Sequence, residues 1–254
     1  MATRDEVEVL PTREALMEAA AARFVSAAGA AIRASGRFVV ALAGGSTPKA
    51  LYALLAGAPW AGRVDWSRVH VFWGDERCVP PDDPASNYRM AREALLAHVP
   101  VSERNVHRIR GEDDPRRAAA AYERVLRETF ATPVGPPRRA PGARFDLVLL
   151  GMGDNGHTAA LFPGGTAVRE TERWVVAEQV EEVGMWRVTL TPVVLDAAAE
   201  VAFLVSGAEK APMLRRVLEG PHEPHALPAQ VVAPHEGRLR WLVDAPAAAR
   251  LDRR

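Results

Sequence analysis

The sequence predicts an α/β protein whose mostly parallel sheet is covered by helices on both faces. Short apolar runs rich in β-formers, such as residues 38–42 and 145–150, lack polar alternation, as strands buried on both faces do. These runs alternate with segments of helical periodicity, which implies right-handed crossovers between parallel strands. With 254 residues, 48% of them hydrophobic, the chain can form one large α/β domain or two small ones.

The N-terminal half is expected to begin with a helix. Thr12 can cap it, and Gly36 lies just past its expected end at about Ala34. Residues 74–83 form an acidic, proline-rich loop. The other expected elements are a strand at 38–42, a helix at 49–56 with Pro48 at its first position, a strand at 69–73, a helix at about 86–98 capped by Ser86, a short strand at 106–109 and a helix at about 114–130.

The C-terminal half follows a stretch, 132–144, whose prolines and glycines are typical of a surface connection. After the strand at 145–150 comes a glycine-rich turn, and a helix can begin near His157 and Thr158. The remaining expected elements are strands at 174–176 and 186–190, a short helix at about 193–199, a strand at 201–205, a helix at about 209–218, and strands at 231–232 and 239–243.

Composition limits the classes of function. The 32 basic and 32 acidic side chains balance, so the net charge does not indicate a nucleic-acid partner. A single cysteine, Cys78, excludes an intrachain disulfide and suits a reducing compartment. The N-terminus is charged, and no uninterrupted apolar run reaches the ~18 residues of a membrane span. We therefore expect a soluble, cytoplasmic protein that acts on a small molecule as a monomer, without a membrane or nucleic-acid partner.

Four loops are expected to meet in one cleft. They follow Leu42, Trp73, Leu150 and Val205, which end four of the predicted parallel strands. Ligands of such sheets bind at the carboxyl ends of the strands. The chemistry of this protein should therefore lie in these loops.

The first of these loops is a candidate anion site. Gly44, Gly45, Ser46 and Thr47 join two glycines and two hydroxyls to a predicted helix N-terminus, which favours a phosphate group. The spacing of a nucleoside-triphosphate loop is absent, and so is the G-x-G-x-x-G pattern of dinucleotide sites. An ordinary strand-to-helix turn is the alternative.

The second loop carries three consecutive charges. Arg77 can hold a phosphate with its planar guanidinium, while Asp75 and Glu76 can accept hydrogen bonds from sugar hydroxyls or orient a catalytic group. A solvated charge cluster is the alternative. Cys78, with no histidine beside it in the sequence, is interpreted as a small filler rather than a nucleophile.

The third and fourth loops supply a histidine and a cation. His157 follows the glycine-rich turn at 151–156, where an imidazole is well placed for small-molecule chemistry; a structural histidine is the alternative. Lys210 precedes a predicted helix, and Arg187 belongs to the strand at 186–190. Cations near a helix N-terminus are favourable where an anion lies between them. The histidines at 222 and 225 lack zinc-site spacing, and we expect neither a metal nor a cofactor.

Together these segments resemble the 6-phosphogluconolactonase family. The resemblance rests on the blocks A-L-A-G-G-S-T-P at 41–48, W-G-D-E-R-C-V-P-P-D-D-P-A-S-N-Y at 73–88, G-M-G-D-N-G-H-T-A-A-L-F-P-G at 151–164, R-V-T-L-T at 187–191 and S-G-A-E-K at 206–210. It implies a Rossmann-like single domain over residues 1–254 and hydrolysis of 6-phospho-glucono-1,5-lactone to 6-phosphogluconate in the pentose phosphate pathway. His157 matches the family's catalytic base. Arg77, Lys210 and the turn at 44–47 would hold the phosphate, with Arg187 assisting.

One position departs from the family pattern. An aspartate usually stands two residues before the histidine, and this chain has Asn155. Asparagine cannot stabilise a protonated imidazole as well as an ionised aspartate does. Either Asn155 only positions the ring, or Asp154 or Asp75 supplies the charge.

Two other functions are alternatives to hydrolysis. Sugar-phosphate isomerases and deaminases of the same superfamily favour D-E-Y where this chain has Asp75-Glu76-Arg77, and an acid where it has Phe162. A non-catalytic sugar-phosphate sensor is the second alternative. No basic helix-turn-helix segment precedes Arg37, which argues against a sensor of the repressor type.

Overall fold

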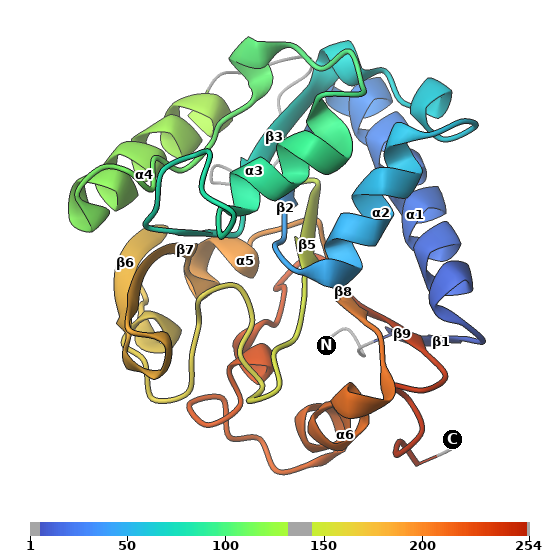
Figure 1. Cartoon of the computed structure of the whole chain (residues 1–254), viewed down its shortest axis with the longest axis vertical. Coiled ribbons are helices and arrows are strands. Elements are labelled where there is room, and N and C mark those ends of the chain that lie inside the picture. Colours follow the sequence, from blue (N-terminus) through green and yellow to red (C-terminus); the bar gives the residue numbers. More distant parts are fainter. Residues whose placement is uncertain (1–5, 132–143, 253–254) are drawn as a thin grey trace.

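A parallel six-stranded sheet forms the centre of the molecule (Figure 1). The structure is a computed structural model that describes residues 6–131 and 144–252. Within these residues the strand order is β1-β9-β8-β5-β2-β3, and all neighbours are parallel, as predicted. The strands are β1 (Glu6–Leu10), β2 (Phe38–Leu42), β3 (Val69–Trp73), β5 (Leu147–Leu150), β8 (Glu200–Val205) and β9 (Arg238–Asp244). The expected surface connection lies, apart from Arg144, outside the described residues.

Helices pack on both faces of this sheet. Phe38 pairs with Val69, whereas Phe72, three residues further along β3, pairs with Ala41, so the two phenylalanines point to opposite faces. The Phe38 ring lies 5.3 Å from that of Phe24 in α1, and the Phe72 ring lies 5.9 Å from that of Tyr122 in α4. The prediction of a doubly covered sheet is thereby confirmed. The helices are α1 (Arg13–Ser35), α2 (Ser46–Ala56), α3 (Asn87–Ala91), α4 (Pro115–Ala131), α5 (Pro192–Leu195) and α6 (Ala211–Glu219).

A second, antiparallel sheet departs from the prediction. Its order is β4-β7-β6, with β4 at Asp75–Arg77, β7 at Met185–Leu190 and β6 at Val175–Val180. We predicted a loop for the first of these segments. It forms a strand because it pairs with β7, where Arg77 lies opposite Arg187. A pairing across more than 100 residues leaves no local pattern in the sequence, so the sequence did not reveal it.

Helix starts and ends also differ from expectation in places. The helix predicted from residue 49 already begins at Ser46, because Gly45, with φ 100°, makes the turn before it. Ser86 caps α3 as predicted, but the helix continues through Arg92–Leu96 in π-helical geometry. The helix expected near residues 193–199 is the single turn α5. No helix begins at His157; instead Thr158 and Leu161 form a bridge that returns the chain.

Two short predicted strands are wrong. The segment at 106–109 touches the sheet edge at one residue pair, an isolated parallel bridge between Val71 and Val106, and does not extend into a strand. Residues 231–232 lie at the end of a 3-10 turn, Pro228–Val231, whose Ala229 N–H donates to the carbonyl of Gly156. Apolar β-branched residues predicted strands in both places, but each segment packs as a loop.

The alanine-rich helix α1 has the length and composition of a membrane span. It contains 23 residues with a hydropathy of 1.3 over its most apolar window, and it lies near the N-terminus. These criteria are weak, because core helices satisfy them too. In the structure α1 contacts α2, β2 and β9, and it buries Leu16 and Phe24. Its apolar residues therefore have a packing role within the domain.

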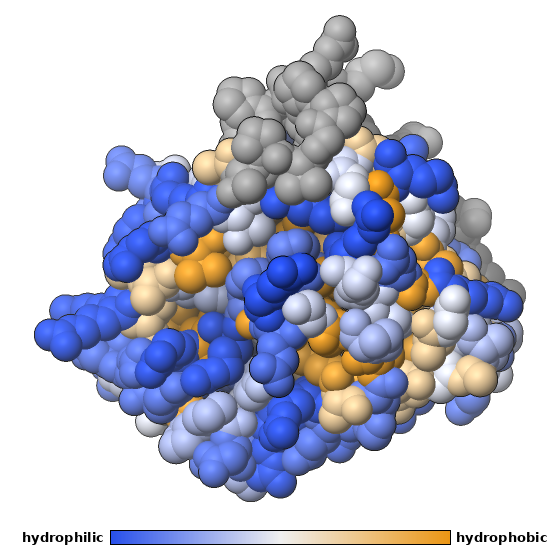
Figure 2. Space-filling view, turned by 90° about the horizontal axis from the view of Figure 1, so that it is seen from above, coloured by the Kyte–Doolittle hydropathy of each residue, from blue (hydrophilic) through white to orange (hydrophobic). Residues whose placement is uncertain are grey.

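The surface is mixed in character. Figure 2, which views the molecule from above Figure 1, shows hydrophilic residues over most of this face, with hydrophobic ones between them. Apolar atoms normally contribute about half of a protein's surface. This face is therefore typical of an ordinary protein exterior.

Candidate active site

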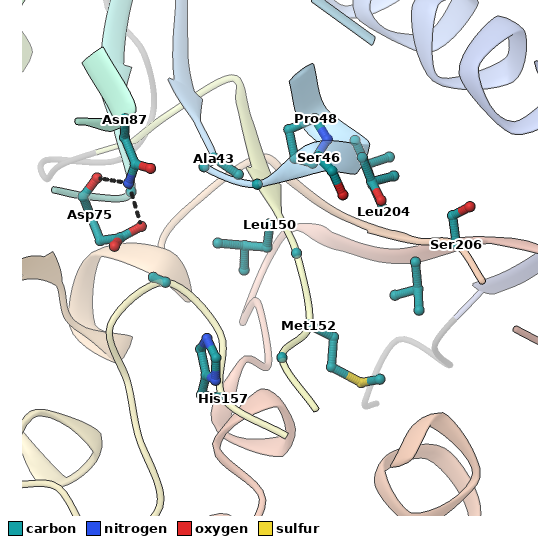
Figure 3. Close-up of a pocket in the computed structure, with 18 of the residues that line it drawn as sticks. Ala43, Ser46, Pro48, Asp75, Asn87, Leu150, Met152, His157, Leu204 and Ser206 are labelled. Carbon is teal, nitrogen blue, oxygen red and sulfur yellow. Dashed lines mark hydrogen bonds between the residues drawn. The ribbon is translucent and has the colours of Figure 1, made fainter. Parts of the chain in front are cut away.

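A cavity of about 230 Å³ opens where four strands of the main sheet end. The loops that follow β2, β3, β5 and β8 all contribute to its wall, so their predicted convergence is confirmed. Figure 3 shows this pocket, with His157 on one side and Ser46 and Pro48 on another. The polar and glycine residues in its lining include Gly44, Gly45, Ser46, Thr47, Asp75, Arg77, Asn87, Gly153, His157, Arg187, Ser206 and Lys210.

The turn into α2 presents a helix N-terminus to the pocket. Gly45 has φ 100°, a conformation that favours glycine, and no side chain caps the helix. The first-turn N–H groups of Ser46 and Thr47 therefore have no capping side chain. Together with the dipole of an 11-residue helix, they favour an anion at this end of the cavity.

Arg77 is the best-placed cation for such an anion. One of its Nη atoms donates to the carbonyl of Ala85 at 3.1 Å and to Oδ1 of Asn87. Among the described residues it forms no ion pair, so these neutral oxygens orient the guanidinium without neutralising its charge. A guanidinium held in this way can bind a phosphate by a bidentate contact.

Lys210 and Arg187 also line the pocket, but each has an acidic partner. Lys210 Nζ lies 2.5 Å from a carboxylate oxygen of Asp154, whose side chain is 82% exposed. An exposed pair contributes little stability, so Lys210 can exchange this partner for a substrate anion. Arg187 lies 3.4 Å from Asp75, and both side chains are buried. Burial lowers the pKa of Arg187, and the Asp75 charge opposes that effect.

Asn87 is a site residue that the sequence analysis missed. Its Nδ2 donates to the carbonyl and to Oδ1 of Asp75, at 2.8 and 3.3 Å (Figure 3). Its Oδ1 accepts from Arg77. The asparagine thereby sets the positions of a carboxylate and a guanidinium in the pocket. The only signal in the sequence was its place in the block at 73–88, directly after the cap residue Ser86.

Glu76 has a different role from the predicted one. Its side chain is 2% exposed and lies outside the pocket lining. Its carboxylate accepts hydrogen bonds from the N–H groups of Asn87 and Tyr88 and from the hydroxyl of Ser86. Alternation along β4 places it on the opposite side from Asp75 and Arg77. Glu76 therefore holds the N-terminus of α3, and contact with sugar hydroxyls is a prediction that the structure contradicts.

His157 is enclosed by a glycine and a ring. An added Cβ at Gly153 would lie 2.1 Å from its Nδ1 and Cε1, so only glycine leaves room for the imidazole there. The Phe162 ring stacks on it with centroids 4.2 Å apart. Burial lowers the pKa of His157, Asp75 and Glu182 act in the opposite sense, and Arg187 and Lys210 lower it further. The histidine is therefore neutral at pH 7 and able to accept a proton.

Hydrogen bonds define which nitrogen of His157 carries the proton. Asn155 Nδ2 donates to Glu182 at 2.7 Å, so its Oδ1 faces the histidine. This oxygen accepts from the His157 backbone N–H at 3.1 Å and lies 2.6 Å from Nδ1. Nδ1 is therefore the protonated nitrogen, and Nε2 retains its lone pair. Neither Asp154 nor Asp75 bonds to the ring, because they pair with Lys210 and Arg187.

Two further observations concern possible metal ligands and the thiol of Cys78. In the described parts of the chain, no group of three or more His, Cys, Asp and Glu side chains is placed to hold a metal ion. Cys78 is partly buried, and burial raises the pKa of its thiol to about 11. At neutral pH the thiol stays protonated and is a poor nucleophile.

The fold and the pocket define a class of protein. They are those of a parallel α/β protein with a small-molecule site at the carboxyl ends of its strands, furnished with cations, a helix N-terminus and a neutral histidine. The chain belongs to the family of glucosamine-6-phosphate isomerases/6-phosphogluconolactonase, whose model matches residues 11–241.

Individual relatives match along nearly the whole chain. A 6-phosphogluconolactonase of Nostoc sp. is 41% identical over 248 residues, which cover 96% of this chain and 98% of that protein. A solved 6-phosphogluconolactonase from Trypanosoma cruzi has a TM-score of 0.85 at 30% identity and covers 100% of this chain and 99% of its own. A monomeric glucosamine-6-phosphate deaminase, with a TM-score of 0.78, covers 96% of this chain and 99% of its own, and at 21% identity the likeness shows a common fold.

Proposed function

We propose that this chain hydrolyses 6-phospho-D-glucono-1,5-lactone to 6-phospho-D-gluconate, the lactonase step of the pentose phosphate pathway. The names of its relatives at 30–41% identity support this reaction. The observation that carries the proposal is a neutral imidazole in the same pocket as an uncapped helix N-terminus and Arg77. One end of the pocket can therefore hold a phosphate while the other activates water.

His157 acts as the general base in the proposed reaction. Nε2 takes a proton from water as the water oxygen bonds to the lactone carbonyl carbon, which gives a tetrahedral oxyanion. The oxyanion collapses, the bond between that carbon and the ring oxygen breaks, and the imidazolium returns its proton to the ring oxygen. The products are a free hydroxyl and a carboxylic acid, which releases its remaining proton to solvent to become a carboxylate, and the histidine is neutral again. Asn155 keeps Nδ1 protonated throughout.

The phosphate would be held away from the reacting carbon. The turn at 44–47 offers N–H groups, and Arg77 and Lys210 offer charges. Arg187 also lines the pocket, but it is paired with Asp75. It therefore holds that carboxylate in place as well as being available to assist phosphate binding. Binding at a remote phosphate aligns the lactone for attack, where orientation contributes most to the rate.

Phe162 supports hydrolysis over the isomerase or deaminase alternative. The resemblance places an acid at this position in those enzymes, and here an apolar ring stacks on His157. Without that acid, the pocket lacks a proton donor for ring opening at this position. Hydrolysis of an ester needs one base that returns its proton, which the histidine supplies.

The proposal is tested by measuring hydrolysis of the phosphorylated lactone and of unphosphorylated glucono-1,5-lactone, each corrected for the uncatalysed rate. We expect the phosphorylated lactone to have the much larger kcat/KM, because only it uses the phosphate end of the pocket. Equal values for both lactones would contradict the phosphate site. No rate above background would contradict the reaction.

The activity should persist to lower pH than an ordinary histidine allows. Burial lowers the pKa of His157, and the neutral imidazole is the active form, so kcat/KM should stay level to below pH 6.5 and fall only as the ring protonates. The measurement is a pH–rate profile between pH 4.5 and 8, divided by the fraction of substrate dianion determined by ³¹P NMR. An acid limb above pH 6.5 after this correction would contradict the assignment.

Alanine at position 153 should slow hydrolysis by about tenfold to a hundredfold. Its Cβ would displace the imidazole, and misplacing a catalytic group by about 1 Å costs up to a hundredfold. Gly153 has a negative φ, so the backbone accepts alanine and the fold should persist. The control is Gly62→Ala, where the added Cβ meets nothing within 4 Å. A Gly153→Ala enzyme with wild-type kcat would show that the ring position is not critical.

Other expectations from the sequence remain proposals. All six strands of the main sheet, drawn from residues 6 to 244, join in one sheet, which supports a single domain. The monomeric state is tested by light scattering on the purified protein. The cytoplasmic location, and independence of nucleic acid and membrane, rest on composition alone.

A further inference from the structure

An acidic side chain next to the second sheet is hydrogen-bonded to Asn155, the partner of His157. Glu182 belongs to the turn Glu181–Val183 that joins β6 to β7, and it accepts the hydrogen bond from Asn155 Nδ2 at 2.7 Å. Asn155 Oδ1 then lies 2.6 Å from His157 Nδ1. A continuous chain of two hydrogen bonds therefore links a carboxylate to the imidazole through a neutral amide.

We propose that Glu182 is a positioning residue that, through Asn155, orients His157 and stabilises its protonated form during hydrolysis. The proposal deepens the proposed function, because it assumes that His157 is the base. It assigns to Glu182 the charge that a directly bonded aspartate would otherwise supply.

The physical basis is polarisation of the amide. A carboxylate that accepts from Nδ2 draws electron density toward Oδ1, so this oxygen becomes a stronger acceptor for the Nδ1–H group. When His157 takes a proton from water, the positive charge that forms is stabilised by this polarised oxygen and by the Glu182 charge behind it. The amide also cannot take up the proton itself, so the ring keeps one tautomer.

The hydrogen bond between Asn155 and Glu182 explains how asparagine can serve at position 155. An aspartate there would place a second carboxylate within hydrogen-bond distance of Glu182 and could not donate to it, so repulsion between like charges would replace the hydrogen bond. Asparagine can donate to Glu182 and accept from His157 at the same time. The negative charge thus lies on Glu182, one hydrogen bond further from the imidazole than an aspartate at position 155 would place it.

Other charged groups near the ring do not replace Glu182. Asp75 also favours the protonated imidazole, but it is buried in its pair with Arg187. Lys210 opposes protonation, and its partner Asp154 is bonded to it rather than to the ring. On the ring's other contacts, Phe162 and Gly153 bring no charge. Within residues 6–131 and 144–252, Glu182 is thus the acid that hydrogen bonds join to His157 through Asn155.

The decisive variant is Glu182→Gln, with Glu181→Gln as the matched control. Glutamine keeps the shape and can still accept from Asn155, so it removes the charge and leaves the bond. We expect kcat for the phosphorylated lactone to fall on the order of tenfold, the lower end of the loss for outer partners of metal-bound histidines, with KM within about twofold. Glu181→Gln removes a charge from the same turn and should leave both constants unchanged.

A second readout does not depend on catalysis. The imidazole C–H resonance of His157, assigned by its absence in His157→Ala, is titrated by NMR in wild type and in Glu182→Gln. The loss of the carboxylate should move the midpoint to lower pH, because Glu182 favours the protonated ring. If wild type shows no lactonase activity, the proposed function fails, and this titration still tests the link to Glu182.

A double variant can place the negative charge at position 155 instead of position 182. In the double variant Glu182→Gln/Asn155→Asp, the new carboxylate accepts directly from Nδ1, and glutamine donates to it. We expect kcat to recover to at least the wild-type value and the midpoint to rise. A wild-type kcat and an unshifted midpoint in Glu182→Gln would overturn the proposal. A double variant no better than Glu182→Gln would likewise show that the charge is not what matters.

Discussion

His157→Ala should lower kcat for the phosphorylated lactone about a thousandfold, with a smaller change in KM. A positioned general base contributes roughly 10² to 10⁴ in rate, and no other described side chain in the pocket combines a neutral, protonatable nitrogen with the orientation given by Asn155. The phosphate end of the pocket is untouched, so substrate binding should persist. The measurement is the initial rate of acid release at constant pH, with the uncatalysed rate subtracted.

Two controls separate chemistry from folding. His225→Ala removes an exposed histidine outside the pocket lining and should leave kcat unchanged. The melting temperature of His157→Ala shows whether the loss of stacking on Phe162 has destabilised the protein. A folded His157→Ala enzyme that retains more than a tenth of the wild-type kcat would refute the role of base.

Arg77→Ala should lower kcat/KM for the phosphorylated lactone by about a hundred- to ten-thousandfold, and barely affect the unphosphorylated one. Hydrogen bonds to charged groups contribute about 1.5–3 kcal/mol each, and a guanidinium can give a phosphate two of them. Arg77→Lys keeps the charge but loses the planar guanidinium, so its kcat/KM for the phosphorylated lactone should lie between those of wild type and Arg77→Ala. The measurement is kcat/KM for both lactones with each variant.

The comparison of the two lactones distinguishes a loss of phosphate binding in Arg77→Ala from a general disturbance of the pocket. Arg77 also bonds to Ala85 and Asn87, so its removal could loosen the loop before α3. In that case both lactones would lose rate equally, and the phosphate role would be refuted. Arg63→Ala, which removes an exposed arginine that lies over Trp60, should change neither value.

The sheet could be predicted because each strand carries its own signal. Phe38–Leu42 is apolar throughout and Val69–Trp73 is apolar except for His70, and a segment of this kind is most stable between two helical layers. Glycine-rich turns after such strands then predict where ligands bind. The pocket and nine of its predicted residues follow from this logic, and Asn155 lies directly behind them.

Contacts between distant segments were beyond the reach of local patterns. Glu76 and Arg77 are neighbours, but only the pairing of β4 with β7 decides that the arginine faces the pocket and the glutamate faces α3. From the sequence alone, Glu182 has the pattern of an ordinary surface acid in a turn. Only the folded structure shows that it accepts a hydrogen bond from Asn155.

The amino-acid sequence by itself determined the order of buried strands and helices, the turns that carry the chemistry, and the family resemblance. Burial and backbone conformation are properties of a few successive residues, so they leave a readable pattern. The tertiary structure alone decided which charges pair, that the Glu76 carboxylate turns away from the pocket, and that Asn155 and Glu182 are hydrogen-bonded in series to His157. Electrostatic and hydrogen-bond partners depend on distances of a few ångströms between segments that are far apart in the chain, and no local pattern encodes them.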